Sequence, residues 1–294
     1  MIIAGVNGGG TKTEAMCCDE SGRILGKGSS GASNYQNIGL DAMVRSVKEA
    51  LSGATKSKPD IMCVGLAGIN TEKDRDAVYM RLSKEFPNLI VEHDAFAELY
   101  GETRGGNGIM VIAGTGSIVL GYDGKRRYRR CDSGWFLGDE GSGYMIGKEG
   151  LRITSKMLVE DFTKSKIAEE IMKSLALKDA GDLMGWAYSQ KNNVTNVAAL
   201  AKIVCKCAQE GDKNAEIIVK RASSILADAT CDLAMRIGVN VAHIKGGLFN
   251  SSMYYSTFSE ALRKRGISAK MINESGAEGA MLIAADKAGI KAMK

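Results

Sequence analysis

The chain is poor in histidine, and its cysteines lack the spacing of a metal site. Only His93 and His243 occur among the 294 residues, which argues against zinc because its protein ligands are mostly histidine and closely spaced cysteine. The seven cysteines are odd in number, never form a Cys-x-x-Cys pair and lie mostly inside apolar runs. We therefore expect buried, reduced thiols and a cytoplasmic protein.

Long apolar runs and a strong charge of one sign are also missing. No apolar run reaches the roughly 18 residues of a membrane span, and no signal peptide precedes the first predicted strand. The net charge of +5 is spread along the chain, so neither a membrane nor nucleic acid is expected as a partner. With 45% hydrophobic and 25% charged residues, the composition is that of a globular protein of about two domains.

Glycine, by contrast, is concentrated near the start of the chain. An apolar run through Val6 leads into Gly8, Gly9 and Gly10, and a second run follows at residues 14–19. Two strands joined by a glycine loop predict a β-hairpin. Without Cβ atoms the glycines let a ligand approach the backbone N–H groups, which together can hold an anion such as phosphate. Thr11 and Lys12 add a hydroxyl group and a positive charge.

Two familiar nucleotide motifs do not fit this loop, and a plain tight hairpin remains an alternative interpretation of it. A P-loop places Gly-Lys-Ser/Thr before a helix, whereas here Thr11 precedes Lys12 and a strand follows. A dinucleotide fingerprint also needs a helix after its glycines.

Downstream, strands and helices alternate. Three strands of a β-meander followed by alternating helices and strands predict an α/β fold with a mixed sheet. Predicted strands lie near residues 24–25 and at 61–66, 89–91, 109–113, 118–122, 241–244 and 268–272. Predicted helices lie at residues 40–51, 72–86, 95–103, 214–237, 251–265 and 277–288, and residues 144–238 are almost wholly helical.

The pattern restarts at a second glycine turn, Gly114-Thr115-Gly116-Ser117, which lies between two predicted strands. This restart predicts two related α/β domains with a cleft between them. We expect an N-terminal domain of residues 1–115 and a C-terminal domain of residues 116–294 that carries the extra helices. The sequence leaves open whether the last helix packs back on the N-terminal domain.

Several glycine motifs, in this order and spacing, resemble the N-acetylglucosamine kinase and BadF/BadG/BcrA/BcrD ATPase family. The most specific is Gly134-Trp-Phe-Leu-Gly-Asp-Glu-Gly-Ser-Gly-Tyr-Met-Ile-Gly147. The other segments that carry the resemblance are Gly8-Gly-Gly-Thr11, Asp94, Gly114-Thr-Gly-Ser117 and Gly246-Gly247. The resemblance implies the two-domain actin-like (ribonuclease H-like) ATPase fold and a kinase that uses ATP and Mg²⁺.

The resemblance also implies roles for individual residues. Those expected to hold ATP are Gly8, Gly9, Gly10, Thr11, Lys12, Thr115, Gly116, Ser117, Gly246 and Gly247. Those expected to contact the sugar are Asn34, Asp94, Thr115, Trp135 and Asp139. The metal is expected near Asn7 and Asp139, although relatives usually carry a carboxylate where this chain has Asn7. An amide oxygen can still accept a bond from a metal-bound water, without the charge.

Asp94 has two interpretations. It follows a predicted buried strand and opens a helix, so it could simply be the helix N-cap. Between two phosphate-type turns it would instead be the general base that takes the proton from the attacking sugar hydroxyl. Trp135 could be a core aromatic as well as a sugar platform, and His93 is expected to be structural.

Three functions compete. The first is a kinase that transfers the γ-phosphate of ATP to a sugar hydroxyl, with a small-molecule sugar as its partner and a homodimer left open. The runner-up substrate is an acidic sugar such as 2-keto-3-deoxygluconate, because five basic residues lie between Lys125 and Arg130 and guanidinium groups bind carboxylates. The second function is an ATPase activator of the iron–sulfur type, which would need cluster cysteines in a glycine loop. The third is an actin-like binding or regulatory module that uses the nucleotide only as a switch.

Overall fold

The computed structural model describes residues 1–160, 165–189, 193–272 and 276–290. Contacts within the chain divide it into two compact units. Unit 1 comprises Met1–Gly108, Asp123–Lys125 and Asn273–Lys294, and unit 2 comprises Ile109–Tyr122 and Arg126–Ile272. The predicted boundary between two domains, which lies between residues 115 and 116, remains a proposal.

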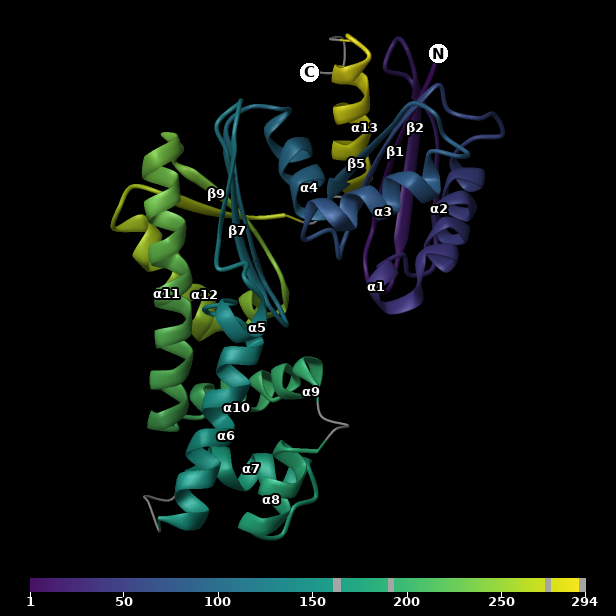
Figure 1. Ribbon diagram of the computed structural model, residues 1–294. Helices are drawn as coiled ribbons and strands as arrows, with labels where there is room; N and C mark the ends of the chain where they lie inside the picture. The colour runs from purple at the N-terminus through teal and green to yellow at the C-terminus, as the bar shows by residue number, and fades with distance from the viewer. Residues whose placement is uncertain (161–164, 190–192, 273–275, 291–294) are drawn as a thin grey trace. The chain divides into compact units, whose positions relative to one another are not determined.

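Unit 1 is built on a five-stranded mixed sheet of order β3-β2-β1-β4-β5 (Figure 1). The glycine-joined strands β1 and β2 pair antiparallel, as the sequence predicts, and β3 extends the meander. The remaining two strands continue the sheet in parallel to β1. The bounds are β1 Ile2–Gly8, β2 Thr13–Asp19, β3 Ile24–Ser30, β4 Ile61–Leu66 and β5 Leu89–His93.

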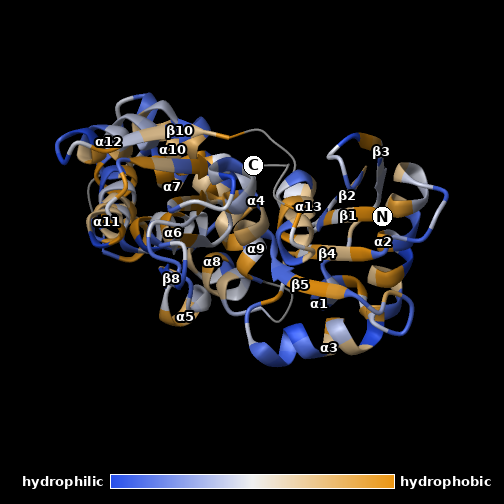
Figure 2. Ribbon diagram, turned by 90° about the horizontal axis from the view of Figure 1, so that it is seen from above, coloured by the Kyte–Doolittle hydropathy of each residue, from blue (hydrophilic) through white to orange (hydrophobic). Residues whose placement is uncertain are grey.

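Both faces of this sheet are covered, because successive side chains of β1 point to opposite sides. Ala4 and Val6 lie in the core under α2, whereas Ile3 lies in the core under α13. Hydrophobic residues accordingly run continuously along β4 and β5 (Figure 2), as expected for strands buried on both faces. The helices of unit 1 are α1 Tyr35–Ile38, α2 Leu40–Ala54, α3 Glu72–Leu82, α4 Asp94–Thr103 and α13 Gly276–Lys287.

Helix α13 is the last helix of the chain, and it packs on the strands at the other end of the sequence. It contacts β1, β4 and α4. Gly5 makes this approach possible, because a Cβ atom there would lie 2.1 Å from the Ala277 carbonyl oxygen and from the Met281 nitrogen. The tyrosine hydroxyl of Tyr100 on α4 bonds to Asp286 of α13.

Two boundaries in unit 1 differ from those that the sequence predicts. Ser29 and Ser30 belong to β3 rather than to a loop, because their backbone pairs with Glu14 and Thr13 of β2. Helix α3 ends at Leu82 rather than at residue 86. Pro87 disfavours a helical conformation at Phe86, the residue before it. The Phe86 N–H bonds to the Leu82 carbonyl where the chain turns.

Unit 2 repeats the strand order of unit 1 in a second sheet, β10-β9-β6-β7-β8. Here too the chain makes a glycine-joined pair, adds a third strand at one edge and completes the other edge with parallel strands. The repeat inferred from the two glycine turns is thus visible in the topology. The bounds are β6 Gly108–Ala113, β7 Ser117–Tyr122, β8 Arg127–Arg130, β9 Val241–Lys245 and β10 Ser268–Met271.

Helices make up most of unit 2, as predicted. The long amphipathic helix α11 packs against β7, α6, α10 and α12, and residues such as Val219, Ala222 and Leu226 are fully buried in its core. No helix within the described ranges is long and apolar enough to span a bilayer. The bounds are α5 Gly134–Leu137, α6 Gly143–Val159, α7 Lys166–Ser174, α8 Ala180–Ala187, α9 Val194–Ala199, α10 Ala201–Gln209, α11 Lys213–Ile237, η1 Gly247–Asn250 and α12 Ser252–Arg263.

Candidate functional site

The first glycine turn joins β1 to β2. The turn closes with a bond from the Gly9 N–H to the Lys12 carbonyl at 3.0 Å. Thr11 and Lys12 are exposed, and a Cβ atom on Gly9 or Gly10 would meet no atom within 4 Å. The turn therefore leaves its glycine backbone open to a ligand. The Lys12 ammonium pairs with Glu14 at 2.6 Å, so its charge is already partly balanced.

A second loop is tied to this turn. The N–H groups of Ser33 and Asn34 bond to the Gly9 carbonyl at 2.9 and 3.1 Å. The Asn34 side chain caps α1 by accepting from the Gln36 N–H at 3.1 Å. Ser33 is fully buried beside Gly8, and its hydroxyl oxygen has no hydrogen-bond partner among the described residues. The polar loop at residues 31–34 is thereby fixed against the glycine turn.

Asn7 lies at the carboxyl end of β1. The parallel register places it opposite Gly65 of β4. Its side-chain oxygen is buried, and no described group forms a hydrogen bond with it. Glycine at positions 65 and 276 leaves room for the amide, since a Cβ atom at either position would come within 3.2 Å of it. A buried acceptor without a partner costs free energy unless a ligand or water satisfies it.

Asp94 follows β5 directly and is the first residue of α4 rather than its N-cap. The N-cap interpretation of Asp94 is wrong, because His93 has the extended cap conformation. The Asp94 oxygen Oδ1 still accepts the Ala95 N–H at 2.8 Å. His93 Nδ1 also lies 2.8 Å from this oxygen, and 3.1 Å from the Ala95 nitrogen.

The Ala95 N–H lies within hydrogen-bond distance of two acceptors, the His93 Nδ1 at 3.1 Å and the Asp94 Oδ1 at 2.8 Å. His93 thereby caps the N-terminus of α4, which is the structural role that the sequence suggests for it. The same N–H orients the Asp94 carboxylate.

These unit 1 residues share one edge of the sheet. Asn7 and Gly65 are the penultimate residues of β1 and β4, and Asp94 directly follows the adjacent parallel strand β5. The carboxyl edge of the parallel strands is where α/β sheets usually bind their ligands. The unit thus brings together these predicted site residues: Asn7, Gly8, Gly9, Gly10, Thr11, Lys12, Asn34 and Asp94.

In unit 2 the second glycine turn is covered by Asp139. The Asp139 carboxylate accepts the Ser117 N–H at 3.1 Å, and a Cβ atom on Gly116 would lie 2.8 Å from it. Asp139 has a left-handed backbone with φ of 56°. Burial raises the pKa of this carboxyl above its ordinary value, although the bond from Ser117 opposes the shift.

The same turn is bound to the start of helix α6. The N–H groups of Gly143 and Tyr144 donate to the carbonyls of Gly114 and Thr115 at 2.8 and 3.0 Å. The Ser117 hydroxyl donates to the Glu140 carbonyl at 2.8 Å. The turn and the Gly-Asp-Glu-Gly-Ser segment therefore form one rigid hydrogen-bonded group.

Trp135 lies on the short helix α5 and is 47% exposed. Its ring packs 5.3 Å from the Tyr144 ring and 5.6 Å from the Phe136 ring. Phe136 and Leu137 are exposed at 80% and 77%. The core interpretation of Trp135 is therefore wrong, and its indole remains accessible to a ligand.

The third glycine turn lies against the end of β6. A Cβ atom on Gly246 would come within 2.2 Å of the Ala113 carbonyl oxygen, and its φ of 119° also requires glycine. Gly247 begins the short 3-10 helix η1. The Gly114 and Gly246 turns are thus neighbours in unit 2.

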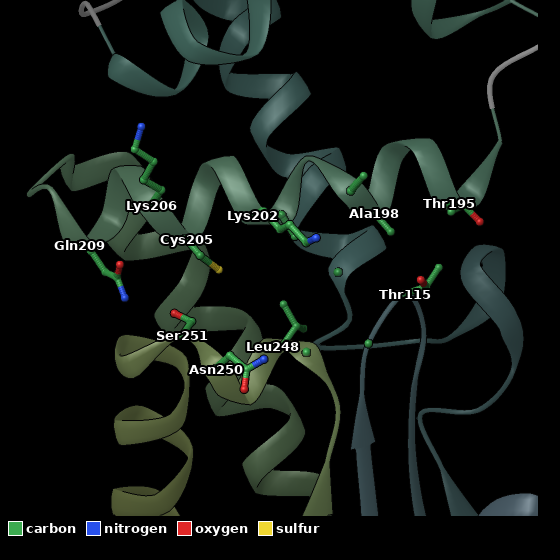
Figure 3. Close-up of a pocket in the computed structure, with 15 residues that line it drawn as sticks. Thr115, Thr195, Ala198, Lys202, Cys205, Lys206, Gln209, Leu248, Asn250 and Ser251 are labelled. Atoms are coloured by element: carbon green, nitrogen blue, oxygen red, sulfur yellow. The ribbon is translucent and has the colours of Figure 1, made fainter. Parts of the chain in front are cut away.

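A pocket of about 640 Å³ opens between these turns and the helices α9 and α10 (Figure 3). Thr115 of the Gly114 turn, Leu248 and Asn250 of η1, and the α12 N-cap Ser251 lie on one side, and α9 and α10 form the opposite side. The residues that line the pocket are Gly114, Thr115, Gly143, Thr195, Ala198, Ala199, Ala201, Lys202, Cys205, Lys206, Gln209, Gly247, Leu248, Asn250 and Ser251. Its volume is in the range typical of small-molecule sites.

Sequence reasoning missed the helical half of this pocket. Ala198 and Ala201 carry no chemical signal, and Lys202 looks like any surface lysine of an amphipathic helix. The buried Ser33 was also missed, although it lies in a recognisable polar loop. Only the fold brings such residues to a ligand site.

Two residues of the basic segment between Lys125 and Arg130 contact other side chains of unit 2. Arg129 pairs with Asp132, and the Arg236 guanidinium lies 4.7 Å from the centroid of the Tyr128 ring. The cysteines lie in strands and helices as predicted, except Cys131, which follows β8. No cysteine lies in the three glycine turns.

Two α/β units with the same strand order and glycine turns between their strands define an actin-like nucleotide-binding fold. The chain belongs to the BadF/BadG/BcrA/BcrD ATPase family, whose sequence profile matches residues 4–284.

The chain is similar to two characterised kinases along most of its length. It is 30% identical to the N-acetyl-D-glucosamine kinase of Dictyostelium discoideum, over 81% of each chain. It is 28% identical to the N-acetylmuramic acid/N-acetylglucosamine kinase of Clostridium acetobutylicum, over 96% of this chain and 97% of that one.

Solved structures share the fold at lower identity. A candidate N-acetylglucosamine kinase from Chromobacterium violaceum superposes with a TM-score of 0.79 at 22% identity, over 96% of this chain and 98% of the other. A ROK family glucokinase from Streptomyces griseus, solved with glucose and AMPPNP, gives 0.57 at 19% identity, over 97% and 98%. Both support the two-unit actin-like architecture.

Proposed function

We propose that this chain is an ATP-dependent kinase that transfers the γ-phosphoryl group to a hydroxyl group of an amino sugar. The observation that carries the proposal is the carboxyl edge of the first sheet, where the oriented Asp94 carboxylate follows β5 and the open glycine turn follows β1. The similarity to two kinases named for N-acetylglucosamine supports this substrate class.

Asp94 would be the general base. In the proposed step its carboxylate accepts the proton of the sugar hydroxyl as the hydroxyl oxygen attacks the γ-phosphorus and the bond to the β-phosphate oxygen breaks. The Ala95 N–H would hold the carboxylate in place by its bond to Oδ1. Asn34 and, from unit 2, Trp135 and Asp139 remain the proposed sugar contacts.

The glycine turns would hold the phosphates. Phosphoryl transfer relies on positioning and charge stabilisation, and the open backbone at Gly9 and Gly10 suits an anion. Thr11 and Thr115 would add hydroxyl donors. Ser117 is a weaker candidate, because its hydroxyl and N–H already bond to Glu140 and Asp139. The Gly246-Gly247 turn would contact the adenosine.

Mg²⁺ fits the unit 1 site through Asn7. The buried side-chain oxygen of Asn7 lacks a partner among the described groups, so it could accept a bond from a metal-bound water. Mg²⁺ would neutralise charge on the phosphates, from which it takes much of its coordination. Asp139 is a second proposed ligand, and its carboxylate is held by the Ser117 N–H.

The decisive experiment measures ADP release by the purified chain with ATP, Mg²⁺ and a panel of sugars. We expect turnover with N-acetylglucosamine and little with glucose, mannose or 2-keto-3-deoxygluconate. Product analysis by mass spectrometry should show a sugar phosphate. ATP hydrolysis that no sugar stimulates would instead favour the nucleotide-switched alternative.

N-acetylmuramic acid is a second candidate substrate. The Clostridium relative is named for it, and its carboxylate would suit the basic strand β8. Replacing Arg127 with Gln should then raise KM for N-acetylmuramic acid about tenfold and leave KM for N-acetylglucosamine and ATP unchanged. Equal KM values in variant and wild type would assign β8 no part in substrate binding.

We further propose a cytoplasmic enzyme. Its free cysteines support this location, because reduced thiols are typical of the cytoplasm. A homodimer remains a proposal that sedimentation would test.

A further inference from the structure

The pocket of unit 2 has an uneven charge distribution. Of its fifteen lining residues, two carry a charge, and both are lysines on α10, Lys202 and Lys206. No aspartate or glutamate is among these lining residues. Such a pocket favours an anionic ligand over a neutral one, since charges at its walls are screened less than in open water.

Several backbone N–H groups at the turn of residues 114–117 already donate hydrogen bonds within unit 2. The N–H groups of Gly143 and Tyr144, at the start of α6, bond to turn carbonyls. The N–H of Gly114 bonds to the Gly116 carbonyl at 2.9 Å, and that of Ser117 bonds to Asp139. Among the side chains that line the pocket, the α10 lysines are the cationic donors that could add to the remaining groups of the turn.

The two lysines differ in their surroundings. Lys206 has Glu170 and Glu210 at 3.8 and 3.9 Å, and in Figure 3 its side chain extends away from the pocket. Lys202 has no carboxylate within ion-pair distance among the described residues. In Figure 3 its side chain extends from α10 between Ala198 and Cys205 into the pocket.

We propose that the Lys202 ammonium binds the phosphate groups of a nucleoside diphosphate or triphosphate in this pocket. The inference rests on the proposed function only in taking the pocket as the nucleotide site. Lys202 then provides the positive charge of this pocket, whose other lysine, Lys206, lies near two carboxylates. Its contribution makes the pocket prefer nucleotides to nucleosides.

The test is calorimetric binding of ADP and of adenosine to the full chain, without sugar or turnover. Lys202→Gln should weaken ADP binding about tenfold, which is typical for loss of one charged hydrogen bond, and leave adenosine binding unchanged. Lys206→Gln is the matched control on the same helix, and it should change both constants less than about twofold. Lys202→Arg should retain most of the ADP affinity. Circular dichroism melting would verify that each variant is folded.

The salt dependence gives an independent readout. Wild-type ADP affinity should fall more steeply with added KCl than that of Lys202→Gln, because the variant has one ionic contact fewer. Equal losses for ADP and adenosine, unchanged ADP binding, or an equal effect of Lys206→Gln would each overturn the proposal. A wild type that binds ADP but phosphorylates no sugar would refute the proposed function and leave the Lys202 assignment intact.

Discussion

The Asp94 carboxylate stabilises the first turn of α4 by accepting the Ala95 N–H, although Asp94 is not the N-cap. It also stands at the carboxyl edge of the sheet, where α/β folds usually bind ligands, and we propose it as the general base. Asp94→Asn should keep ADP affinity within about twofold and lower kcat by roughly 10²–10⁴, the usual contribution of a general base. Single-turnover kinetics with ATP and N-acetylglucosamine would measure this loss. Wild-type turnover by the variant would exclude Asp94 as the base.

Asn7 sets the expected metal dependence. Asn7→Asp supplies the charge that the amide lacks and should lower the Mg²⁺ concentration for half-maximal rate at least about twofold. Asn7→Leu should raise it, because the Asn7 oxygen that can accept from a metal-bound water is lost. Electron paramagnetic resonance of Mn²⁺ bound to the ADP complex would rank the metal affinities of the two variants and the wild type in the same order, without turnover. Identical metal dependence in both variants would place the metal away from Asn7.

Asp139 should make stability depend on pH. Burial raises its folded pKa above the ordinary value of 3.8, so its stabilising contribution is complete below pH 3.8 and is lost as pH rises through the folded pKa. Asp139→Asn keeps an acceptor for the Ser117 N–H without the charge. The variant should therefore melt about 2 °C higher than wild type at pH 7, a modest effect because water screens a half-buried group.

This difference in Tm should shrink as pH falls towards 3.8. Scanning calorimetry between pH 4 and 8 would follow it. A difference that does not change with pH, or a variant that melts lower at pH 7, would contradict the assigned cause.

At the scale of single elements, close packing between backbones decides where glycine is needed. Gly5 in β1 faces α13, and a Cβ atom there would overlap the helix backbone. Gly5→Ala should lower the free energy of unfolding by about 3 kcal/mol, measured by urea denaturation. Gly31→Ala is the control, because its Cβ atom would meet nothing within 4 Å. Equal stability of the two variants would show that α13 does not pack as closely on β1 as described.

At the scale of the whole molecule, the units differ in what they contribute to nucleotide binding. Every residue lining the pocket between the Gly114 turn and α10 belongs to unit 2. ADP should therefore slow amide hydrogen exchange in residues 194–209 and 247–252 and leave that of α2 unchanged. Mass spectrometry of peptic fragments would locate the effect. Protection confined to unit 1 would place the nucleotide elsewhere.

The sequence alone determined the local elements and the chemistry of the turns. Alternating apolar periodicity, glycine pairs and capping residues act between near neighbours along the chain. They therefore predict the strands and the glycine-joined hairpin of β1 and β2. The glycine motifs also predict the family, because phosphate binding depends on a few backbone positions at fixed spacing.

Only the tertiary structure decided which distant residues meet. The contact of α13 with β1, the unpartnered oxygen of Asn7 and the orientation of Lys202 depend on strand order and helix packing. Lys202 and Lys206 lie one turn apart on α10, and in the sequence they differ in that Glu210 follows Lys206 at four residues. Their surroundings differ because Glu170 lies beside one of them in space. Long-range packing of this kind leaves no local signal in the sequence.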